Sequence, residues 1–385
     1  MIYLDAAATT PVRPEVLQAL WPVLSGTFGN PASHHEVGES ARAVLEDARR
    51  RVAAVLGCRP AEVLFTSGGT EADNAALKGI ALARRARDPR LDRVLISAIE
   101  HPAVTESAEY LARVHGFAVD VVPVDHRGVI LAEDFAALLG ERTAVASVMY
   151  ANNEVGTVQD IPALAALAQQ AGAPLHSDAV QAAGALPLNV RELGVAALSL
   201  AGHKLGAPKG NGVLYLKSRT PFEPLLHGGG QQRDRRSGTE DVVGAVAFAT
   251  ALELAETERR TADGPAAAAR RDRFIRAVQD AAPDAVLTGD PVNRLPGSAS
   301  FCFPGVAGET VLLELERRGI VCSSGSACAA GSSEPSAVLT AMGYPADVAL
   351  TAVRFSLPRD TSDDDLEVTA RAVGEILGRL GVGAG

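Results

Sequence analysis

The stretch EVLFTSGGTE, from Glu62 to Glu71, contains the pattern that decides the fold. The apolar run over Glu62–Thr66 predicts a strand, Ser67–Thr70 (SGGT) predicts a tight turn, and Glu71–Arg87 has apolar residues at helical spacing. Short β-branched runs alternate with helical stretches in the same way through the first two thirds of the chain. This alternation predicts an α/β fold, with a mostly parallel sheet covered by helices on both faces.

The composition of the sequence changes after about Asp241, where a long predicted helix rich in Ala, Glu and Arg precedes a smaller set of strands and helices. Before this point the predicted strands are Arg93–Ser97, Val119–Val122, Thr143–Met149, Pro174–Ser177, Ala196–Leu200 and Gly212–Leu216, and the helices are Pro102–His115 and Ile161–Ala171. Beyond it we predict strands at Pro296–Phe303 and Thr351–Leu357 and a closing helix at Asp363–Leu380. The chain therefore divides into a large domain, residues 15–257, and a smaller α/β domain made of residues 1–14 and 258–385.

Composition excludes several classes of protein. With 385 residues, 47% hydrophobic and 21% charged, the chain has globular proportions, which excludes a wholly disordered chain and a small disulfide-stapled domain. Acidic residues outnumber basic ones by 46 to 36, and the net charge of −10 argues against a general affinity for nucleic acid or anionic membranes. No apolar stretch approaches the roughly 20 residues of a membrane span. We expect a cytoplasmic protein.

The four cysteines are too few and too scattered for an extracellular disulfide framework. None belongs to a C-x-x-C pair, and the one close couple, Cys322 and Cys328, has no neighbouring histidine, so we expect no metal site. Three of the four are predicted to be buried. At most one is expected to react, because thiolate chemistry requires exposure and a positive environment.

Polar groups follow several predicted strands. Ser67–Thr70 is either a cup for a phosphate group or an ordinary helix cap with a tight turn. Lys204, between an apolar strand and a Gly/Pro-rich loop, is either an amine with a lowered pKa that can form an imine or a solvated loop charge. Asp178 can hold a ring nitrogen protonated or cap the next helix. His101 and the segment Asn152–Glu154 are similarly placed, and the carboxyl ends of parallel strands meet at one sheet edge.

The C-terminal part contains two further candidates. Cys328 lies in a stretch of small polar residues, Cys322–Ser333, typical of a surface loop that can bring a thiol to a pocket. The alternative is a glycine-rich connection with an incidental cysteine. Arg354 lies inside an apolar strand, where a guanidinium needs a carboxylate partner, either from a substrate or from an internal Asp or Glu.

Five motifs together resemble a known family. They are YLDAAATT at Tyr3–Thr10, FGNPAS at Phe28–Ser33, RSGT at Arg236–Thr239, SSGSAC ending at Cys328, and RFSL at Arg354–Leu357. In this order, over nearly the whole chain, they resemble the pyridoxal-phosphate-dependent cysteine desulfurases of the NifS/IscS type, within the class V aminotransferases. The resemblance implies a homodimer with the type I fold of pyridoxal-phosphate-dependent transferases.

The resemblance also implies which residues bind the cofactor, pyridoxal 5'-phosphate. Lys204 would bind it covalently, and Asp178 would pair with the pyridinium nitrogen. Gln181 would bond the phenolic oxygen, while His101 would stack on the ring and assist proton transfer. The phosphate would be held by Gly69, Thr70 and His203, with Thr239 reaching it from the partner subunit. Asn153 would lie beside the cofactor.

The implied activity converts L-cysteine to L-alanine and passes the sulfur to an acceptor protein, such as an iron–sulfur scaffold or a thiolation enzyme. Arg354 and Asn30 would receive the substrate carboxylate, and Cys328 would take the sulfur as a persulfide. Two alternatives stay open. The chain could be a selenocysteine lyase, which would keep Lys204 and Asp178, or a non-catalytic scaffold for sulfur assembly.

Three positions depart from the family pattern. Ala201 stands where relatives commonly have a serine that helps to bind phosphate, which predicts a weaker cofactor site. The spacing after Asn30 is one residue short, so the pattern leaves open whether His34 or His35 faces the substrate. After Cys328 the chain reads Ala-Ala-Gly in place of a Thr/Ser-rich continuation, which could alter loop mobility.

Overall fold

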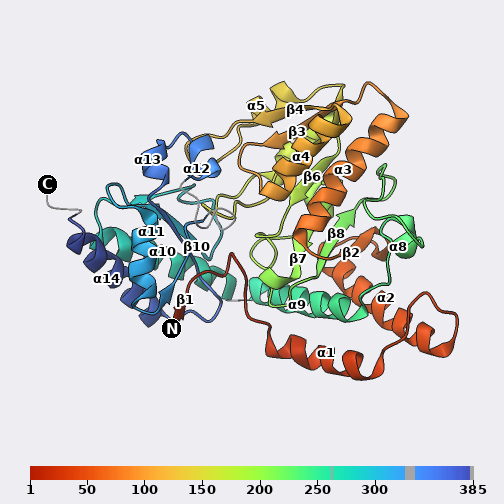
Figure 1. Cartoon of the computed structure of the whole chain (residues 1–385), viewed down its shortest axis with the longest axis horizontal. Coiled ribbons are helices and arrows are strands. Elements are labelled where there is room, and N and C mark those ends of the chain that lie inside the picture. The colour runs from red at the N-terminus through yellow and green to blue at the C-terminus, as the bar shows by residue number, and fades with distance from the viewer. Residues whose placement is uncertain (262, 326–333, 382–385) are drawn as a thin grey trace.

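A large mixed sheet forms the centre of the computed structural model, which describes residues 1–261, 263–325 and 334–381 (Figure 1). Within these residues the sheet has seven strands in the order β2-β8-β7-β6-β5-β3-β4. Their bounds are β2 Val63–Thr66, β3 Arg93–Ser97, β4 Ala118–Val122, β5 Thr143–Ser147, β6 Leu175–Asp178, β7 Ala197–Ala201 and β8 Gly212–Leu216. Strand β8 is antiparallel to both of its neighbours, and the other pairings are parallel, so the predicted mostly parallel sheet is confirmed.

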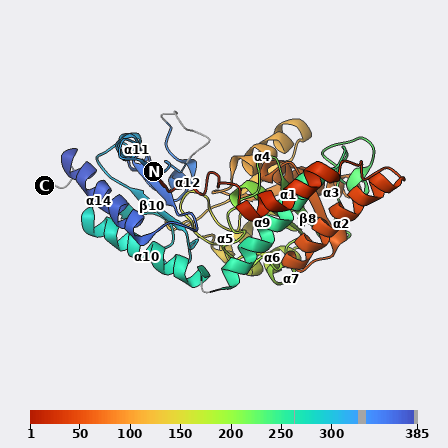
Figure 2. The same cartoon turned by 90° about the horizontal axis from the view of Figure 1, so that it is seen from below.

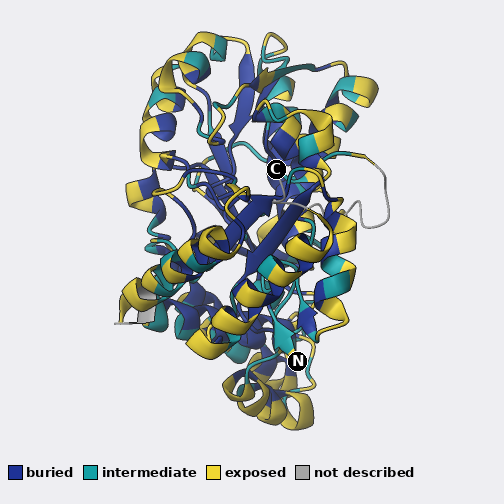
Figure 3. Cartoon of the chain, turned by 90° about the vertical axis from the view of Figure 1, so that its left-hand side faces the viewer, coloured by how far each residue is buried: buried dark blue, intermediate teal, exposed yellow. Residues whose placement is uncertain are grey.

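Alternate residues of each strand face opposite sides of the sheet, and both sides are buried. Leu64 and Ile96 face the helices α3 (Gly69–Arg87) and α4 (Pro102–His115). Phe65 and Leu95 belong to the other core, which is covered by α1 (Pro14–Gly26), α2 (Glu36–Leu56), α6 (Ile161–Gln170) and α9 (Val242–Arg260). Figure 3 shows buried strands inside helices whose outer faces are exposed. The strands read as continuous apolar runs because both faces are covered.

A second core lies at the other end of the molecule (Figure 2). Its three-stranded antiparallel sheet has the order β12-β10-β9, and a two-stranded parallel sheet pairs β1 with β11. These strands are β1 Ile2–Tyr3, β9 Val286–Leu287, β10 Ser298–Cys302, β11 Ile320–Val321 and β12 Ala352–Ser356, and the long helices packed there are α10 Asp263–Ala281, α11 Gly308–Glu316 and α14 Asp363–Arg379. Leu4 belongs to this core, whereas Val16 belongs to a core of the large sheet. The chain therefore passes from one core to the other between these two residues.

The short elements connect these layers. They are η1 Pro60–Glu62, α5 Ala132–Leu138, α7 Val190–Leu193, η2 Gly202–Lys204, α8 Gln231–Asp234, α12 Ala337–Ala341 and α13 Ala346–Ala349. Strand β5 ends at Ser147, two residues before its predicted end, because the Met149 amide donates to the carboxylate of Glu100 (2.7 Å) instead of to a strand. Among the described residues no helix is long and apolar enough to cross a bilayer.

Candidate active site

The structure brings the polar groups that follow the strands to one edge of the large sheet. Strands β2, β3, β5, β6 and β7 run in the same direction, so their carboxyl ends lie together. The groups found there are Gly69, Thr70, His101, Asn153, Asp178, Gln181, His203 and Lys204. In open α/β sheets this edge is where ligands bind.

Helix α3 begins directly at this edge. Its first residue is Gly69, two positions earlier than predicted, and its N-terminus has no side-chain cap. No capping side chain therefore accepts hydrogen bonds from the N–H groups of the first turn. These groups are available to bind an anion. A Cβ atom on Gly69 would lie 2.7 Å from Cγ2 of Val180 and 3.4 Å from Cβ of Ala201, so only glycine fits this close approach.

Asp178 is the last residue of β6 and is 5% exposed. Its Oδ1 accepts a hydrogen bond from the Val180 amide (2.8 Å). Burial raises the pKa of this carboxyl, while that bond and the nearby His101 and Lys204 act in the opposite direction. Burial lowers the pKa of His101, because it disfavours the charged imidazolium. Nδ1 of His101 accepts a hydrogen bond from the Ala103 amide (3.1 Å). The site thus contains both a buried carboxyl group and an imidazole that burial keeps neutral.

Lys204 ends the short helix η2, directly after β7. Its Nζ donates to the carbonyl oxygens of Ala7 and Ala8, the latter at 2.8 Å, and Nε2 of Gln181 donates to the Ala7 carbonyl at 3.0 Å. The N-terminal segment therefore lies across the site. Burial and the charge of Lys204 lower the pKa of His203 to about 4, and Nδ1 of His203 lies 3.2 Å from Oγ1 of Thr9. The position of this segment across the site does not follow from the local sequence pattern.

Arg354 is buried in β12, with 1% of its surface exposed. Its Nη2 pairs with Oδ1 of Asp5 at 2.7 Å, and its Nη1 donates to the carbonyls of Asn153 (2.9 Å) and Gly325 (3.1 Å). Its Nε is buried and has no hydrogen-bond partner among the residues that the structure describes. Of the two carboxylate partners that the sequence left open, the structure contains the internal one, Asp5, and Nε is the donor left for a further ligand.

Other predicted residues do not join this group within one chain. Asn30 is exposed, in the connection between α1 and α2, at the end of the molecule away from β12 (Figures 1 and 2). In the same connection His34 is exposed, and His35 caps α2 by accepting the Gly38 amide hydrogen at 3.2 Å. Thr239 is also exposed. Cys328 lies outside the described residues.

The other three cysteines are poor nucleophiles. Burial raises the pKa of Cys302 to about 11 and that of Cys58 to about 12. Burial also raises the pKa of Cys322, which packs against the second core. A thiol with a raised pKa carries little thiolate at neutral pH, so none of the three is suited to attack a substrate.

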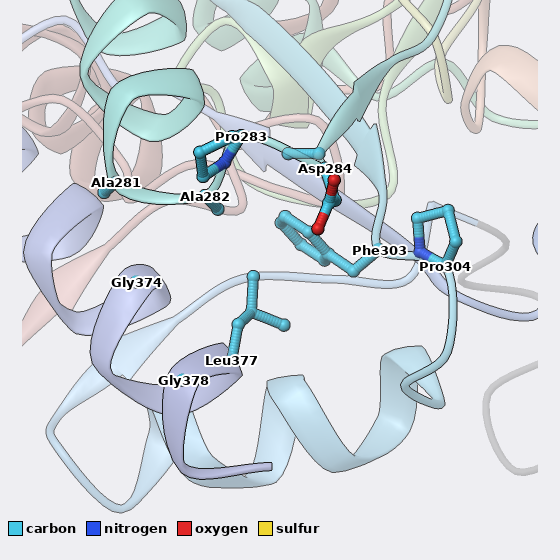
Figure 4. Close-up of a pocket in the computed structure, with 10 residues that line it drawn as sticks. Ala281, Ala282, Pro283, Asp284, Phe303, Pro304, Gly374, Leu377 and Gly378 are labelled. Carbon is cyan, nitrogen blue, oxygen red and sulfur yellow. The ribbon is translucent and has the colours of Figure 1, made fainter. Parts of the chain in front are cut away.

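Two cavities differ sharply in chemistry. One, of about 690 Å³, lies between the N-terminal segment and the loop after β12, and Ala6, Thr10, Lys204 and Leu357 are among its lining residues. The other, of about 200 Å³, lies between the ends of α10 and α14 (Figure 4), and Asp284 is the one ionisable residue in its lining. The first is therefore the cavity with reactive groups.

Comparison with known proteins decides the family. The sequence pattern described as aminotransferase class-V matches residues 2–368. This chain belongs to the class V aminotransferase family. The predicted resemblance to NifS/IscS-type cysteine desulfurases is thereby confirmed by relatives of nearly the same length.

Among the relatives of this class V aminotransferase is the cysteine desulfurase IscS of Dictyoglomus turgidum, 41% identical over 98% of this chain and 95% of the relative. The cysteine desulfurase NifS of Azotobacter vinelandii is 43% identical over 98% of this chain and 93% of its own. A solved structure described as a NifS-like protein aligns with a TM-score of 0.90 and 34% identity, covering 98% of this chain and 99% of the other. The type I fold of pyridoxal-phosphate-dependent transferases follows from these matches.

The site of this class V aminotransferase fits a phosphorylated pyridine cofactor. The uncapped start of α3 and the close approach at Gly69 suit a phosphate group, and the buried Asp178 suits a ring nitrogen. Lys204 supplies an amine at the same edge of the sheet. We found no conflict between this donor set and such a group among the described residues.

Proposed function

We propose that this class V aminotransferase is a pyridoxal-phosphate-dependent cysteine desulfurase that converts L-cysteine to L-alanine and holds the released sulfur as a persulfide on Cys328. The observation that carries the proposal is the meeting of Lys204, the buried Asp178 and the uncapped start of α3 at one sheet edge. The names of the full-length relatives support the choice of cysteine as substrate. The fold alone would leave the reaction open.

The cofactor-binding residues each have a definite task. Gly69, Thr70 and His203 hold the phosphate, with Thr239 reaching it from the partner subunit. Asp178 keeps the ring nitrogen protonated, Gln181 bonds the phenolic oxygen, His101 stacks on the ring, and Asn153 lies beside it. The bound cofactor withdraws electrons from the amino acid and so acidifies its Cα–H bond. His101, held neutral by burial, offers a flat uncharged ring that stacks on the cofactor.

The remaining chemistry belongs to the protein's own groups. The amine of Lys204 would hold the cofactor in the resting enzyme and, when free, would take the Cα proton of the substrate and later return it to Cα. The thiolate of Cys328 attacks the sulfur of L-cysteine, so an S–S bond forms as the C–S bond breaks. The electron pair of the C–S bond remains with the three-carbon skeleton, which takes up a proton and leaves as alanine.

Arg354 receives the substrate carboxylate in this proposal. Within the described part of the chain its buried Nε has no hydrogen-bond partner, whereas the two other nitrogens have partners, and this supports the role. A role for Asn30 in the same contact requires the second subunit, because the connection between α1 and α2 lies at the end of the molecule away from β10 (Figure 1). We therefore propose a homodimer in which Asn30 and Thr239, both exposed, face the site of the partner.

The wider setting is also part of the proposal. We propose a cytoplasmic enzyme that passes sulfur to an acceptor protein, an iron–sulfur scaffold or a thiolation enzyme. The core at β10 and β12 contains no residue of the two cores on the faces of the large sheet, which supports the division into residues 15–257 and residues 1–14 with 258–385. A fourth cluster, which contains Met149 and Met342, packs the two parts together. The acidic net charge of −10 supports an acceptor protein over nucleic acid as the partner.

The test is incubation of the holoenzyme with L-cysteine, followed by quantification of alanine and mass analysis of the cysteine peptides. We expect one extra sulfur on the peptide that contains Cys328 and one alanine per sulfur. Modification at Cys58, Cys302 or Cys322 alone would contradict the proposal. A Cys328→Ala variant that loses activity on cysteine but keeps it on selenocysteine supports desulfuration. A wild-type protein that binds a sulfur-assembly partner but forms no alanine from cysteine supports the scaffold alternative.

A further inference from the structure

The segment from Gly230 to Glu240, which carries Thr239, has a main chain that its surroundings must hold in place. Gln232, Arg233 and Asp234 have φ angles of 49°, 62° and 61°, in the left-handed region. This region is disfavoured for residues other than glycine, and such a conformation persists where the surrounding structure fixes it. Helix α8 of this segment lies beside β2, the outermost strand of the large sheet (Figure 1). The contacts that hold the segment therefore decide where Thr239 lies.

Gln232 joins this segment to the edge of β2. It is buried, with 7% of its surface exposed. Its side-chain Oε1 accepts a hydrogen bond from the Phe65 amide (2.8 Å), and its Nε2 donates to the Phe65 carbonyl (2.6 Å). The side-chain amide thus pairs with the main chain of the outermost strand as a neighbouring strand would. Because β2 leads directly into the turn Ser67–Thr70, this contact connects the segment to the proposed phosphate site.

Arg236 makes a second connection, to the first turn of α3. Its Nε donates to Oε1 of Glu71 (2.9 Å) and its Nη2 donates to Oε2 of the same carboxylate (3.2 Å). Oε2 of Glu71 also accepts a hydrogen bond from the Ser67 amide (2.7 Å). Burial raises the pKa of Glu71, but the hydrogen bonds from Arg236 and Ser67 outweigh burial and lower the pKa below its ordinary value. The pair is therefore ionic at neutral pH, and its two parallel hydrogen bonds fix the direction of the guanidinium.

The third nitrogen of Arg236 stays within its own segment, where Nη1 donates to the carbonyl of Ser237 (3.4 Å). The next amide, that of Gly238, donates to Oε1 of Gln231 (2.9 Å). These bonds fix the main chain directly before Thr239, which is itself exposed. Since all three guanidinium nitrogens have partners in the same chain, Arg236 is suited to hold Thr239 in place and not to bind a ligand itself.

The chain is also held on the other side of Thr239. Oε1 of Glu240 accepts a hydrogen bond from Nη2 of Arg49 (3.3 Å). Arg49 is 1% exposed, and its Nη1 donates to the carbonyl of Val63 in β2 (2.6 Å). The exposed Thr239 is therefore flanked by two charged contacts, and both lead to the unit formed by β2 and the start of α3.

We propose that Arg236 is a positioning residue that acts across the dimer: through Glu71 it holds Thr239 of its own chain at the phosphate of the cofactor bound by the partner subunit. The inference rests on the proposed homodimer and on the proposed role of Thr239. The start of α3, which anchors Arg236, is also the proposed phosphate site of its own chain, so one rigid unit serves both cofactors. Without Arg236, the segment loses more conformational freedom when Thr239 meets the phosphate, and the cofactor of the partner subunit binds more weakly.

The test uses mixed dimers, purified through two different tags, in which one subunit carries Lys204→Ala. Only the other subunit, the reporting subunit, can then form a covalent adduct with pyridoxal phosphate. The stripped dimers are titrated with pyridoxal phosphate, and the adduct is measured by borohydride reduction and peptide mass at Lys204. The reference dimer has no other substitution.

The position of Arg236→Ala in the mixed dimer decides between the two subunits. When Arg236→Ala is added to the Lys204→Ala subunit, the reporting site receives Thr239 from the altered chain, and its affinity for pyridoxal phosphate should fall about tenfold. When Arg236→Ala is placed in the reporting subunit, Thr239 comes from an intact chain, and the affinity should equal that of the reference dimer.

Homodimers separate positioning from direct binding. The control Arg233→Ala removes an exposed arginine of the same segment, whose ion pair is with Glu46 of α2 (3.4 Å), and should bind pyridoxal phosphate as the wild type does. Arg236→Ala combined with Glu71→Gln should lose less affinity than the two single losses together, because both remove one pair. Additive losses would show that Arg236 binds the phosphate itself and would contradict the inference. In the apoprotein, Arg236→Ala should speed hydrogen exchange at the Gly238 amide.

The inference is wrong if Arg236→Ala in the Lys204→Ala subunit leaves the reporting site as tight as in the reference dimer. It is also wrong if Arg236→Ala in the reporting subunit weakens binding equally, since Arg236 would then act on the site of its own chain. Should Arg236→Ala fail to fold, Arg236→Lys, which keeps the charge without the paired hydrogen bonds, decides by the same comparison. A monomeric wild-type protein refutes the homodimer and the inference together. A wild-type dimer that binds pyridoxal phosphate but forms no alanine from L-cysteine refutes the proposed reaction and leaves the role of Arg236 intact.

Discussion

Replacing Gly69 by alanine tests the proposed cofactor site most directly. The added Cβ would lie 2.7 Å from Cγ2 of Val180. Carbon atoms in contact are normally about 3.5–4.0 Å apart, so the overlap is roughly 1 Å. Overpacking of this size costs about 1–3 kcal/mol, and the better helix propensity of alanine returns at most about 1 kcal/mol. We expect the apoprotein to lose about 0–3 kcal/mol of stability.

The effect on the cofactor should be larger than the effect on folding. The clash moves the first turn of α3, whose uncapped N–H groups are the proposed phosphate donors. Hydrogen bonds to a charged group contribute about 1.5–3 kcal/mol, so affinity for pyridoxal phosphate should fall about 10- to 100-fold. The measurement is a titration of the stripped protein with pyridoxal phosphate, by absorbance and equilibrium dialysis.

Two further variants separate packing from ligand binding. Gly378→Ala changes a helical glycine of α14 where an added Cβ would meet no other described residue within 4 Å, so it should leave cofactor affinity unchanged. Adding Val180→Ala to Gly69→Ala removes the clashing methyl group and should recover affinity relative to Gly69→Ala, with Val180→Ala alone as the reference. If Gly69→Ala binds the cofactor as tightly as the wild type, the phosphate does not lie at the start of α3.

Substitutions at three other positions have effects of predictable direction. Ala201→Ser places a hydroxyl beside Gly69 and should tighten pyridoxal phosphate binding about tenfold in the same titration, whereas weaker binding would refute the proposed contact. Burial raises the pKa of Glu100 to about 8 from an ordinary 4.5. The contribution of Glu100 to the free energy of unfolding is therefore fully present below pH 4.5 and is lost as the pH rises towards 8. The loss is on the order of a few kcal/mol. Glu100→Gln should flatten this dependence in urea unfolding between pH 5 and pH 8, and an unchanged slope would exclude Glu100 as its cause. Asp5→Ala leaves the buried Arg354 charge without its carboxylate and should lower the free energy of unfolding by about 3 kcal/mol, with Asp5→Asn losing less; equal stability of Asp5→Ala and the wild type would contradict a structural pair.

Local patterns predicted the elements well because they depend on neighbours in sequence. Strands β3 and β8 and helix α4 have their predicted bounds, and β5 is shorter because a distant carboxylate, Glu100, takes the Met149 amide. The alternation of strands and helices also predicted that Asp178 and Lys204 share one edge of the sheet. That follows from strand direction, which the connecting helices determine.

The contacts of Asp5 and Glu154 could not be predicted in this way. Their contacts join positions far apart in sequence: Asp5 with Arg354, and Glu154 with Ser336. The buried arginine in an apolar strand was the one available signal, since it required a carboxylate partner. Which acid would supply it depends on how the N-terminal segment crosses the second core.

The amino-acid sequence by itself determined the order of strands and helices, the family, and the chemical groups available for the reaction. Only the tertiary structure decided the charge states and partners of those groups: the neutral imidazole of His101, the raised pKa of Glu100, and the engagement of Arg354 by Asp5. The physical reason is that desolvation and Coulomb interactions sum over all surrounding atoms, whatever their place in the chain. Helical and strand periodicity, in contrast, is set within a few residues.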